Sequence, residues 1–112
     1  MTAQKVNILG TEYKIMFRKI NEDNILKKAD GYIDKTVKKI IIADKEDDSD
    51  LEDFQAYQNK VIRHEITHAF FLESGLGENF ENCEYGISET IVDWFAIQSP
   101  KIFKIFKELD IL

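Results

Sequence analysis

Residues 51–75 read LEDFQAYQNKVIRHEITHAFFLESG, and this stretch predicts a long helix near the middle of the chain. From Leu51 to about Glu73 neither glycine nor proline interrupts it, and a stripe of residues recurs at three- and four-residue steps, as in a helix with one buried face. Polar residues late in such a stripe are unusual for a face that packs on a core. The stripe consists of Leu51, Phe54, Gln58, Val61, Glu65, His68 and Leu72.

The flanks of this stretch predict where the helix begins and ends. Ser49 and Glu52 have the spacing of a capping box, within an acidic run that suits the positive end of a helix dipole. After Glu73, the sequence Ser74-Gly75-Leu76-Gly77 is typical of a helix end.

The residues before the helix predict a small antiparallel or mixed sheet. Val6 and Ile8, followed by Gly10, indicate a short strand and a turn. Residues 12–18 alternate with period two, with Tyr13, Ile15 and Phe17 on one face. Residues 21–30 predict a loop or short helix. Tyr32-Ile33 and Lys38–Ala43 then predict a second hairpin around residues 34–36.

The residues after the helix predict two more helices, separated at Pro100. The first covers Ile87–Gln98. The second is short and covers Lys101–Ile111, with its lysines on the solvent side. Its inward positions are expected to be Ile102, Phe103, Ile105, Phe106 and Leu109. Together, the predicted strands and helices indicate an α+β fold, with residues 1–112 forming a single domain.

Composition excludes several classes of protein. With 112 residues and a net charge of −6, general nucleic-acid binding is not expected, because it depends on basic residues that neutralise phosphates. The single cysteine, Cys83, rules out an internal disulfide. Neither a membrane span nor an N-terminal signal sequence is predicted, so a cytoplasmic location is expected, with no membrane partner.

The two histidines of the chain, His64 and His68, form an H-E-x-x-H pattern. At about 100° per residue, His68 lies roughly 40° around the helix from His64 and one turn further on, so both imidazoles can reach one metal ion. Glu65 lies beside that position, where a carboxylate can accept a proton from metal-activated water. This pattern predicts a metal site.

A catalytic zinc usually has three protein ligands, and the chain offers no third histidine. The third ligand is therefore expected to be Asp, Glu or Cys83. Glu89 and Asp93 are four residues apart and share a helical face. Glu89 can ligate, and Asp93 can accept the second N–H of a ligating imidazole. Cys83 is the alternative ligand, in a loop without such a partner.

The combination of H-E-x-x-H with E-x-x-x-D after a gap of about twenty residues resembles the gluzincin metallopeptidases. The chain is most similar to the minimal members, called minigluzincins, and to the ImmA/IrrE-type metallopeptidases of phages and mobile elements. The segments HEITHAFFLESGL and SETIVDWFAIQSPKI carry this resemblance. It implies a zincin-like domain that binds Zn²⁺ through His64, His68 and Glu89, with Asp93 behind the ligands.

The resemblance also implies a reaction. Glu65 would act as general base and general acid in zinc-dependent hydrolysis of a peptide bond, with a protein or peptide as substrate, such as one regulatory protein. Larger gluzincins supply a Tyr or His to the oxyanion, and Tyr85 is the first candidate here, ahead of Tyr32 and Tyr57. The strand at Lys38–Ala43 is expected to lie along the cleft and to accept the substrate as an extra strand.

Two other functions remain open at this point. The chain could be a zincin-shaped protein-binding module without catalysis, in which zinc is structural or absent. It could also be a phage accessory protein without chemistry. An intact Glu65 favours the peptidase, because a structural metal site has no use for a base at that position.

Overall fold

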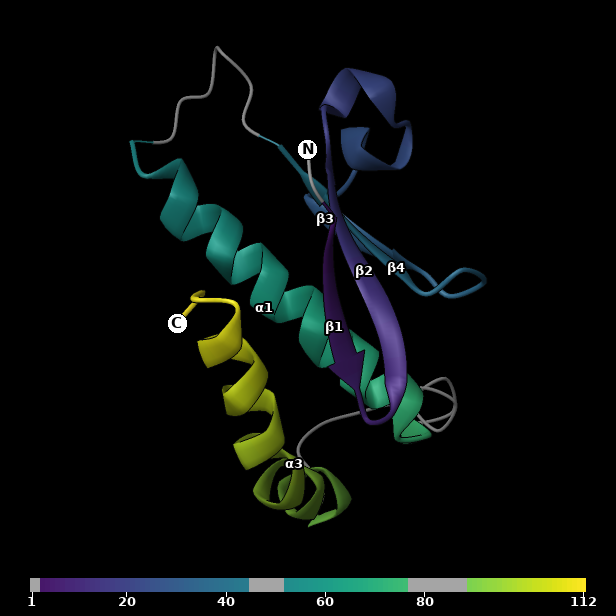
Figure 1. The fold of residues 1–112 in the computed structure, drawn as a ribbon, viewed down its shortest axis with the longest axis vertical. Coiled ribbons are helices and arrows are strands. Elements are labelled where there is room, and N and C mark those ends of the chain that lie inside the picture. Colours follow the sequence, from purple (N-terminus) through teal and green to yellow (C-terminus); the bar gives the residue numbers. More distant parts are fainter. Residues whose placement is uncertain (1–2, 45–51, 77–88) are drawn as a thin grey trace.

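The computed structural model describes residues 3–44, 52–76 and 89–112; for residues 89, 90, 92, 93 and 96 it describes the backbone alone. Within these ranges the fold is a four-stranded mixed sheet with two helices, which confirms the expected α+β class (Figure 1). The elements are β1 (Gln4–Ile8), β2 (Thr11–Arg18), β3 (Gly31–Asp34), β4 (Lys39–Ala43), α1 (Phe54–Glu73) and α3 (Glu89–Glu108).

The strand order in the sheet is β1-β2-β4-β3. The two hairpins, β1–β2 and β3–β4, are antiparallel, as the turn signals predict, and β2 and β4 join them in parallel. In consequence β4 is an interior strand, paired on both sides. The prediction that Lys38–Ala43 accepts a substrate as an extra strand is therefore wrong, because its backbone groups are already used by β2 and β3. The edge strand beside it is β3.

The alternation in β2 is confirmed by its burial. Tyr13 and Ile15 are fully buried on the face that packs against α1, and Phe17 is partly buried there. The opposite face carries Lys14 and Met16. The residues of the core cluster come from the sheet (Val6, Ile8, Tyr13, Ile15, Ile40, Ile42), from α1 (Val61, Ile62, Ile66, Ala69, Phe70) and from α3 (Trp94, Ile102, Ile105, Phe106).

The outer face of the sheet is partly covered by the segment between β2 and β3. This segment forms two short 3-10 helices, Ile20–Glu22 and Ile25–Lys27, in agreement with the predicted loop or short helix. Leu26 packs there in a second small cluster, with Ile41 and Ala43 of β4. These two 3-10 helices do not extend over the other end of this face.

Helix α1 begins later than predicted. Its first residue is Phe54, and the cap is Asp53, whose carboxylate accepts a hydrogen bond from the backbone N–H of Ala56. The predicted cap, Ser49, lies outside the described residues. The end is as predicted: Gly75 adopts a left-handed conformation (φ 88°) that suits glycine.

The buried face of α1 is also shifted from the predicted stripe. It comprises Gln58, Val61, Ile62, Glu65, Ile66, Ala69 and Phe70, whereas His68 is exposed. The predicted stripe therefore combines residues of the buried face with His68 and Leu72, which line a pocket.

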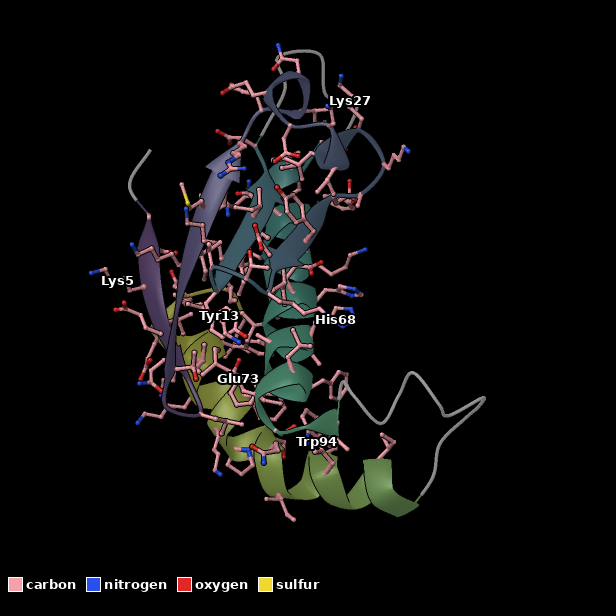
Figure 2. The ribbon with its side chains drawn as sticks, turned by 90° about the vertical axis from the view of Figure 1, so that its right-hand side faces the viewer. Lys5, Tyr13, Lys27, His68, Glu73 and Trp94 are labelled. Atoms are coloured by element: carbon pink, nitrogen blue, oxygen red, sulfur yellow. The ribbon has the colours of Figure 1, made fainter. Side chains whose placement is uncertain are left out.

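The prediction of two helices separated at Pro100 is wrong. Helix α3 continues through Pro100, and its ribbon changes direction midway (Figures 1 and 2). A proline lacks the N–H and crowds the carbonyl four residues earlier, so here it bends the helix without ending it. Phe103 was expected to face inward but is 50% exposed, while Ile102, Ile105 and Phe106 are buried.

Glu73, the last residue of α1, fastens this helix to the sheet. Its carboxylate accepts hydrogen bonds from the hydroxyls of Thr11 (2.7 Å) and Tyr13 (2.6 Å), and it forms an ion pair with Lys38 (2.9 Å). These contacts fix the end of α1 against both hairpins. Neither of the two described helices has the combination of length and apolarity needed to cross a membrane.

Candidate metal centre

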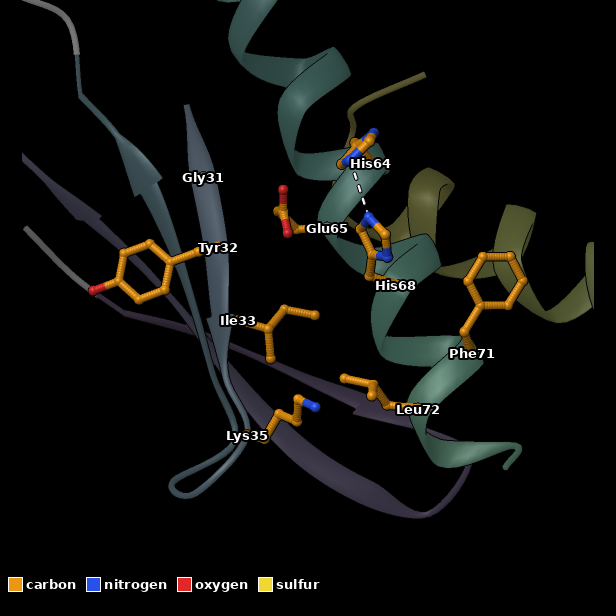
Figure 3. Close-up of a pocket in the computed structure, with 9 residues that line it drawn as sticks. All are labelled: Gly31, Tyr32, Ile33, Lys35, His64, Glu65, His68, Phe71 and Leu72. Carbon is orange, nitrogen blue, oxygen red and sulfur yellow. Dashed lines mark hydrogen bonds between the residues drawn. The ribbon is translucent and has the colours of Figure 1, made fainter. Parts of the chain in front are cut away.

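The two histidines converge on α1, as the spacing predicts. Their Nε2 atoms are 3.1 Å apart, and the rings meet edge to face (Figure 3). Two nitrogens that each lie about 2.05 Å from one tetrahedral zinc are about 3.3 Å apart. The pair therefore already has the separation that two ligands of one zinc ion require. Both side chains are exposed at the surface of α1, so an ion can reach them.

The electrostatics of the pair favour a neutral imidazole at His68. Burial lowers the pKa of His68, and the neighbouring His64 lowers it further. A metal binds the neutral form of histidine, so a lowered pKa keeps this ligand ready at neutral pH.

Glu65 occupies the space between α1 and the edge strand β3 (Figure 3). Its side chain is 7% exposed, and in the described part of the chain its carboxylate has no hydrogen-bond partner. Burial raises the pKa of Glu65, an effect that His64 partly offsets. A glutamate that lines a pocket beside two imidazoles, with a pKa raised by burial, is a candidate for proton-transfer chemistry.

A pocket of about 640 Å³ opens beside these three residues. Two sides are formed by α1 and β3, and the lining is mainly apolar. A second hollow, of about 370 Å³, lies on the other side of the histidine pair and reaches Phe106 of α3. The larger pocket is lined by Gly31, Tyr32, Ile33, Lys35, His64, Glu65, His68, Phe71 and Leu72 (Figure 3).

Gly31 sets how closely β3 approaches the site. A Cβ atom at this position would lie 3.0 Å from Cγ1 of Val61 and 3.2 Å from Cγ of Glu65. Both contacts are shorter than side chains normally tolerate, so any larger residue would press β3 and α1 apart. Gly31 is the first residue of β3, and the strand packs at this point directly on the candidate catalytic residue Glu65.

The outer edge of β3 presents free backbone groups to the pocket. The N–H of Ala43 donates to the carbonyl of Asp30 (2.9 Å), one position before the register pair Gly31–Ile42. Because bonded and non-bonded pairs alternate along an antiparallel ladder, Gly31 and Ile33 direct their N–H and C=O groups away from β4. No other described strand pairs with that edge.

An aromatic contact chain links the site to α3. The ring of Phe71 lies 6.3 Å from that of His68 and 4.5 Å from that of Trp94. Trp94 is buried, as expected for a core residue, and its Nε1–H donates to the hydroxyl of Ser74 (2.9 Å). These contacts dock α3 at Trp94 against the end of α1, beyond the histidines.

Two of the tyrosines considered for the oxyanion are engaged elsewhere. Tyr32 lines the pocket, but its hydroxyl donates to Asp23 (2.6 Å), which is also paired with Arg18. The Tyr57 hydroxyl donates to Asp30, and this hydrogen bond, together with burial, raises the pKa of Tyr57. Neither hydroxyl is directed at the histidine pair.

The side chains of the remaining predicted site residues lie outside what the structure describes. Glu89 and Asp93 belong to α3, for which only the backbone is described at these two positions. Tyr85 and Cys83 fall within residues 77–88, outside the described ranges. Among the described side chains, no group of three potential metal ligands occurs. The structure thus brings together His64, Glu65 and His68, and the third ligand stays a prediction.

Comparison with protein-family models, with curated proteins and with solved structures found no match to this chain.

Sequence reasoning missed the contribution of β3 to this site. The pocket-lining residues Ile33, Phe71 and Leu72 had no distinguishing motif, since apolar residues in a strand or helix first suggest a core. Gly31 did carry a signal, because a glycine that begins an apolar strand can mark a close backbone approach.

Proposed function

We propose that this chain is a small zinc-dependent metallopeptidase of the gluzincin type. The observation that carries the proposal is the mostly buried Glu65, which lines an open pocket beside two converging imidazoles. Two exposed imidazoles that converge beside an acid in a pocket are the residue types that bind and activate a metal ion. The resemblance to minigluzincins and ImmA/IrrE-type enzymes of phages rests on the same residues.

The metal would be held by His64 and His68, with Glu89 as the third ligand and Asp93 as acceptor for the second N–H of one imidazole. The contact between Trp94 and Phe71 joins α3 to α1 at a point five residues from Glu89 and three residues from His68. Bound zinc would supply a Lewis acid that polarises the scissile carbonyl and makes water a better nucleophile. Cys83 is the alternative third ligand.

Glu65 would move the proton. Its pKa is raised by burial, so the carboxylate is a stronger base than an exposed glutamate and a competent acid after protonation. It would accept a proton from the attacking water and deliver it to the nitrogen of the leaving amine. Hydroxide adds to the carbonyl carbon, and the C–N bond breaks as the nitrogen is protonated.

The edge of β3 would hold the substrate as an extra strand. The outward-facing backbone groups of Gly31 and Ile33 can pair with an extended peptide, which would then pass over the pocket beside Glu65. Ile33, Phe71 and Leu72 offer apolar contacts to its side chains. A single protein with an exposed extended segment, such as a regulator, is the substrate class that suits this arrangement.

The direct test measures new N-termini released from a library of proteome-derived peptides. The zinc-loaded wild type is expected to cleave, and a chelator is expected to stop it. Glu65→Gln is expected to abolish cleavage while it retains zinc; Glu12→Gln, an exposed change on β2, serves as matched control and is expected to cleave normally. Cleavage by Glu65→Gln at the wild-type rate would refute the mechanism. A zinc-free wild type without cleavage would favour the protein-binding module.

A further inference from the structure

Lys35 brings a positive charge to one end of the larger pocket. It follows β3 directly, at the first position of the turn that leads to β4. Figure 3 shows its side chain directed toward α1, on the side of Leu72, while Glu65 and His64 lie at the other end of the pocket. Lys35 is exposed, so a molecule that enters the pocket can reach its ammonium group.

The pocket wall around Lys35 is apolar. Ile33 of β3 and Phe71 and Leu72 of α1 line it with side chains that cannot balance a charge. Among the described lining residues, Lys35 alone carries a permanent positive charge. An ammonium group beside an apolar wall attracts an opposite charge more strongly than one surrounded by water, because the wall lowers the local dielectric constant.

The two elements that form the pocket, α1 and β3, contain three acidic residues, and none of them pairs with Lys35. Asp34 follows a pocket-lining residue and so points to the outer face of the sheet, where it interacts with Lys39 opposite it. Glu73 is held by the ion pair and hydrogen bonds described above. Glu65 lies at the other end of the pocket. Within the described residues the ammonium group of Lys35 makes no ion pair or hydrogen bond, so its charge is available to a ligand.

We propose that Lys35 selects substrates that carry a carboxylate on one side of the scissile bond. Because Lys35 would act on a peptide held for hydrolysis, this role rests on the peptidase function proposed above. Gly31 marks the position of Glu65 along β3, since a Cβ at Gly31 would lie 3.2 Å from Cγ of Glu65. Lys35 lies four residues further on, at most about 14 Å along an extended chain. The carboxylate is therefore expected about two to four residues from the bond that is cleaved.

Two sources can supply such a carboxylate: the side chain of Asp or Glu, and the free C-terminus of a short peptide. The test identifies the residues around each bond that the zinc-loaded protein cleaves in a proteome-derived peptide library at low salt. One half of the library keeps its free C-termini, and the other half is amidated. A side-chain carboxylate is expected to be enriched at one position, at least about threefold over its frequency in the library, in both halves. A preference for the C-terminus is instead lost on amidation.

Variants of Lys35 show whether this residue causes the preference. Lys35→Gln is expected to lose the enrichment and Lys35→Arg to keep it, whereas Lys35→Glu should favour Lys or Arg at the same position. Lys5→Glu is the matched control, because it makes the same change of charge at an exposed position of β1, the opposite edge of the sheet from β3. This control is expected to keep the wild-type preference.

The possible failures of this role and of the proposed function can be told apart. Cleavage by the wild type without a preference for a carboxylate, or with one that persists in Lys35→Glu, would overturn the role of Lys35 and leave the peptidase intact. An equal loss of preference in Lys35→Glu and Lys5→Glu would also overturn it, because net charge would then be the cause. A wild type that cleaves nothing would overturn both. Lys35→Gln is expected to melt at the wild-type temperature, and a lower value would contradict the absence of a partner for this lysine.

Discussion

Replacing Glu73 with alanine should loosen the whole fold, because this carboxylate joins the end of α1 to both hairpins. Two hydroxyl donors, on Thr11 and Tyr13, bond to it at 2.7 and 2.6 Å. A hydrogen bond to a charged group contributes about 1.5 kcal/mol at the lower end of its range. The ion pair with Lys38 adds about 0.5 kcal/mol, because the lysine side chain is 43% exposed and solvent screens the pair.

The expected loss for Glu73→Ala is therefore about 3.5 kcal/mol in the free energy of unfolding, a large fraction of the stability of a small domain. At about 4 °C per kcal/mol for a chain of this length, the melting temperature should fall by roughly 14 °C. Urea denaturation followed by circular dichroism measures the free energy, and Glu12→Ala on the exposed face of β2 is the control. A loss below about 1 kcal/mol would refute this account of the contact.

The effect of Glu73 should also depend on pH. Its hydrogen bonds, with that of Tyr13 first, lower its pKa in the folded state. A lowered carboxyl pKa stabilises the fold fully above the pKa of the unfolded chain, and this stability is lost as the pH falls through the folded pKa. The difference between wild type and Glu73→Ala should thus be constant above about pH 4.5 and shrink below it. A difference that grows on acidification would contradict the assignment.

Three further tests concern Gly31, the hydrogen bond between Trp94 and Ser74, and the cap of α1. Gly31→Ala should destabilise by about 1–3 kcal/mol, because its Cβ would crowd Val61 and Glu65; unchanged stability in urea would show that β3 is not so close to α1. Trp94→Phe and Ser74→Ala both remove the hydrogen bond from the indole to the hydroxyl, and Ser74→Ala also removes the one that this hydroxyl donates to the carbonyl of Phe71. Each should cost about 1 kcal/mol or more and the double variant less than the sum of the two; additive losses would argue against the shared bond. Asp53→Ala should cost about 1 kcal/mol by removing the cap of α1, whereas Asp53→Asn should be nearly neutral; equal losses in calorimetry would place the cap elsewhere.

The sequence predicts the elements of this fold where periodicity and turn chemistry agree. The alternation around Tyr13 and Ile15 identifies β2 and its buried face, and Gly10 and Gly75 mark the hairpin and the helix end. The H-E-x-x-H spacing predicts the convergence of His64 and His68 on its own, because helical geometry fixes it.

Other features depend on tertiary context that a local pattern does not contain. Pro100 usually ends a helix, but α3 continues through it, with Ile102 and Phe106 beyond the proline packed in the core. The strand order also lies beyond local pattern. Lys38–Ala43 is strongly β-prone, but only the parallel pairing with β2 makes it interior and leaves β3 at the edge.

Metal content of the untagged protein, measured by native mass spectrometry after incubation with zinc, tests the central claim most directly. The wild type and Glu65→Gln are expected to carry one zinc per chain. His68→Ala should carry none, and Glu89→Ala should lose the metal if Glu89 is the third ligand. A wild type that binds no zinc, or a His68→Ala variant that binds it as well as the wild type, would contradict a metal centre at the histidine pair.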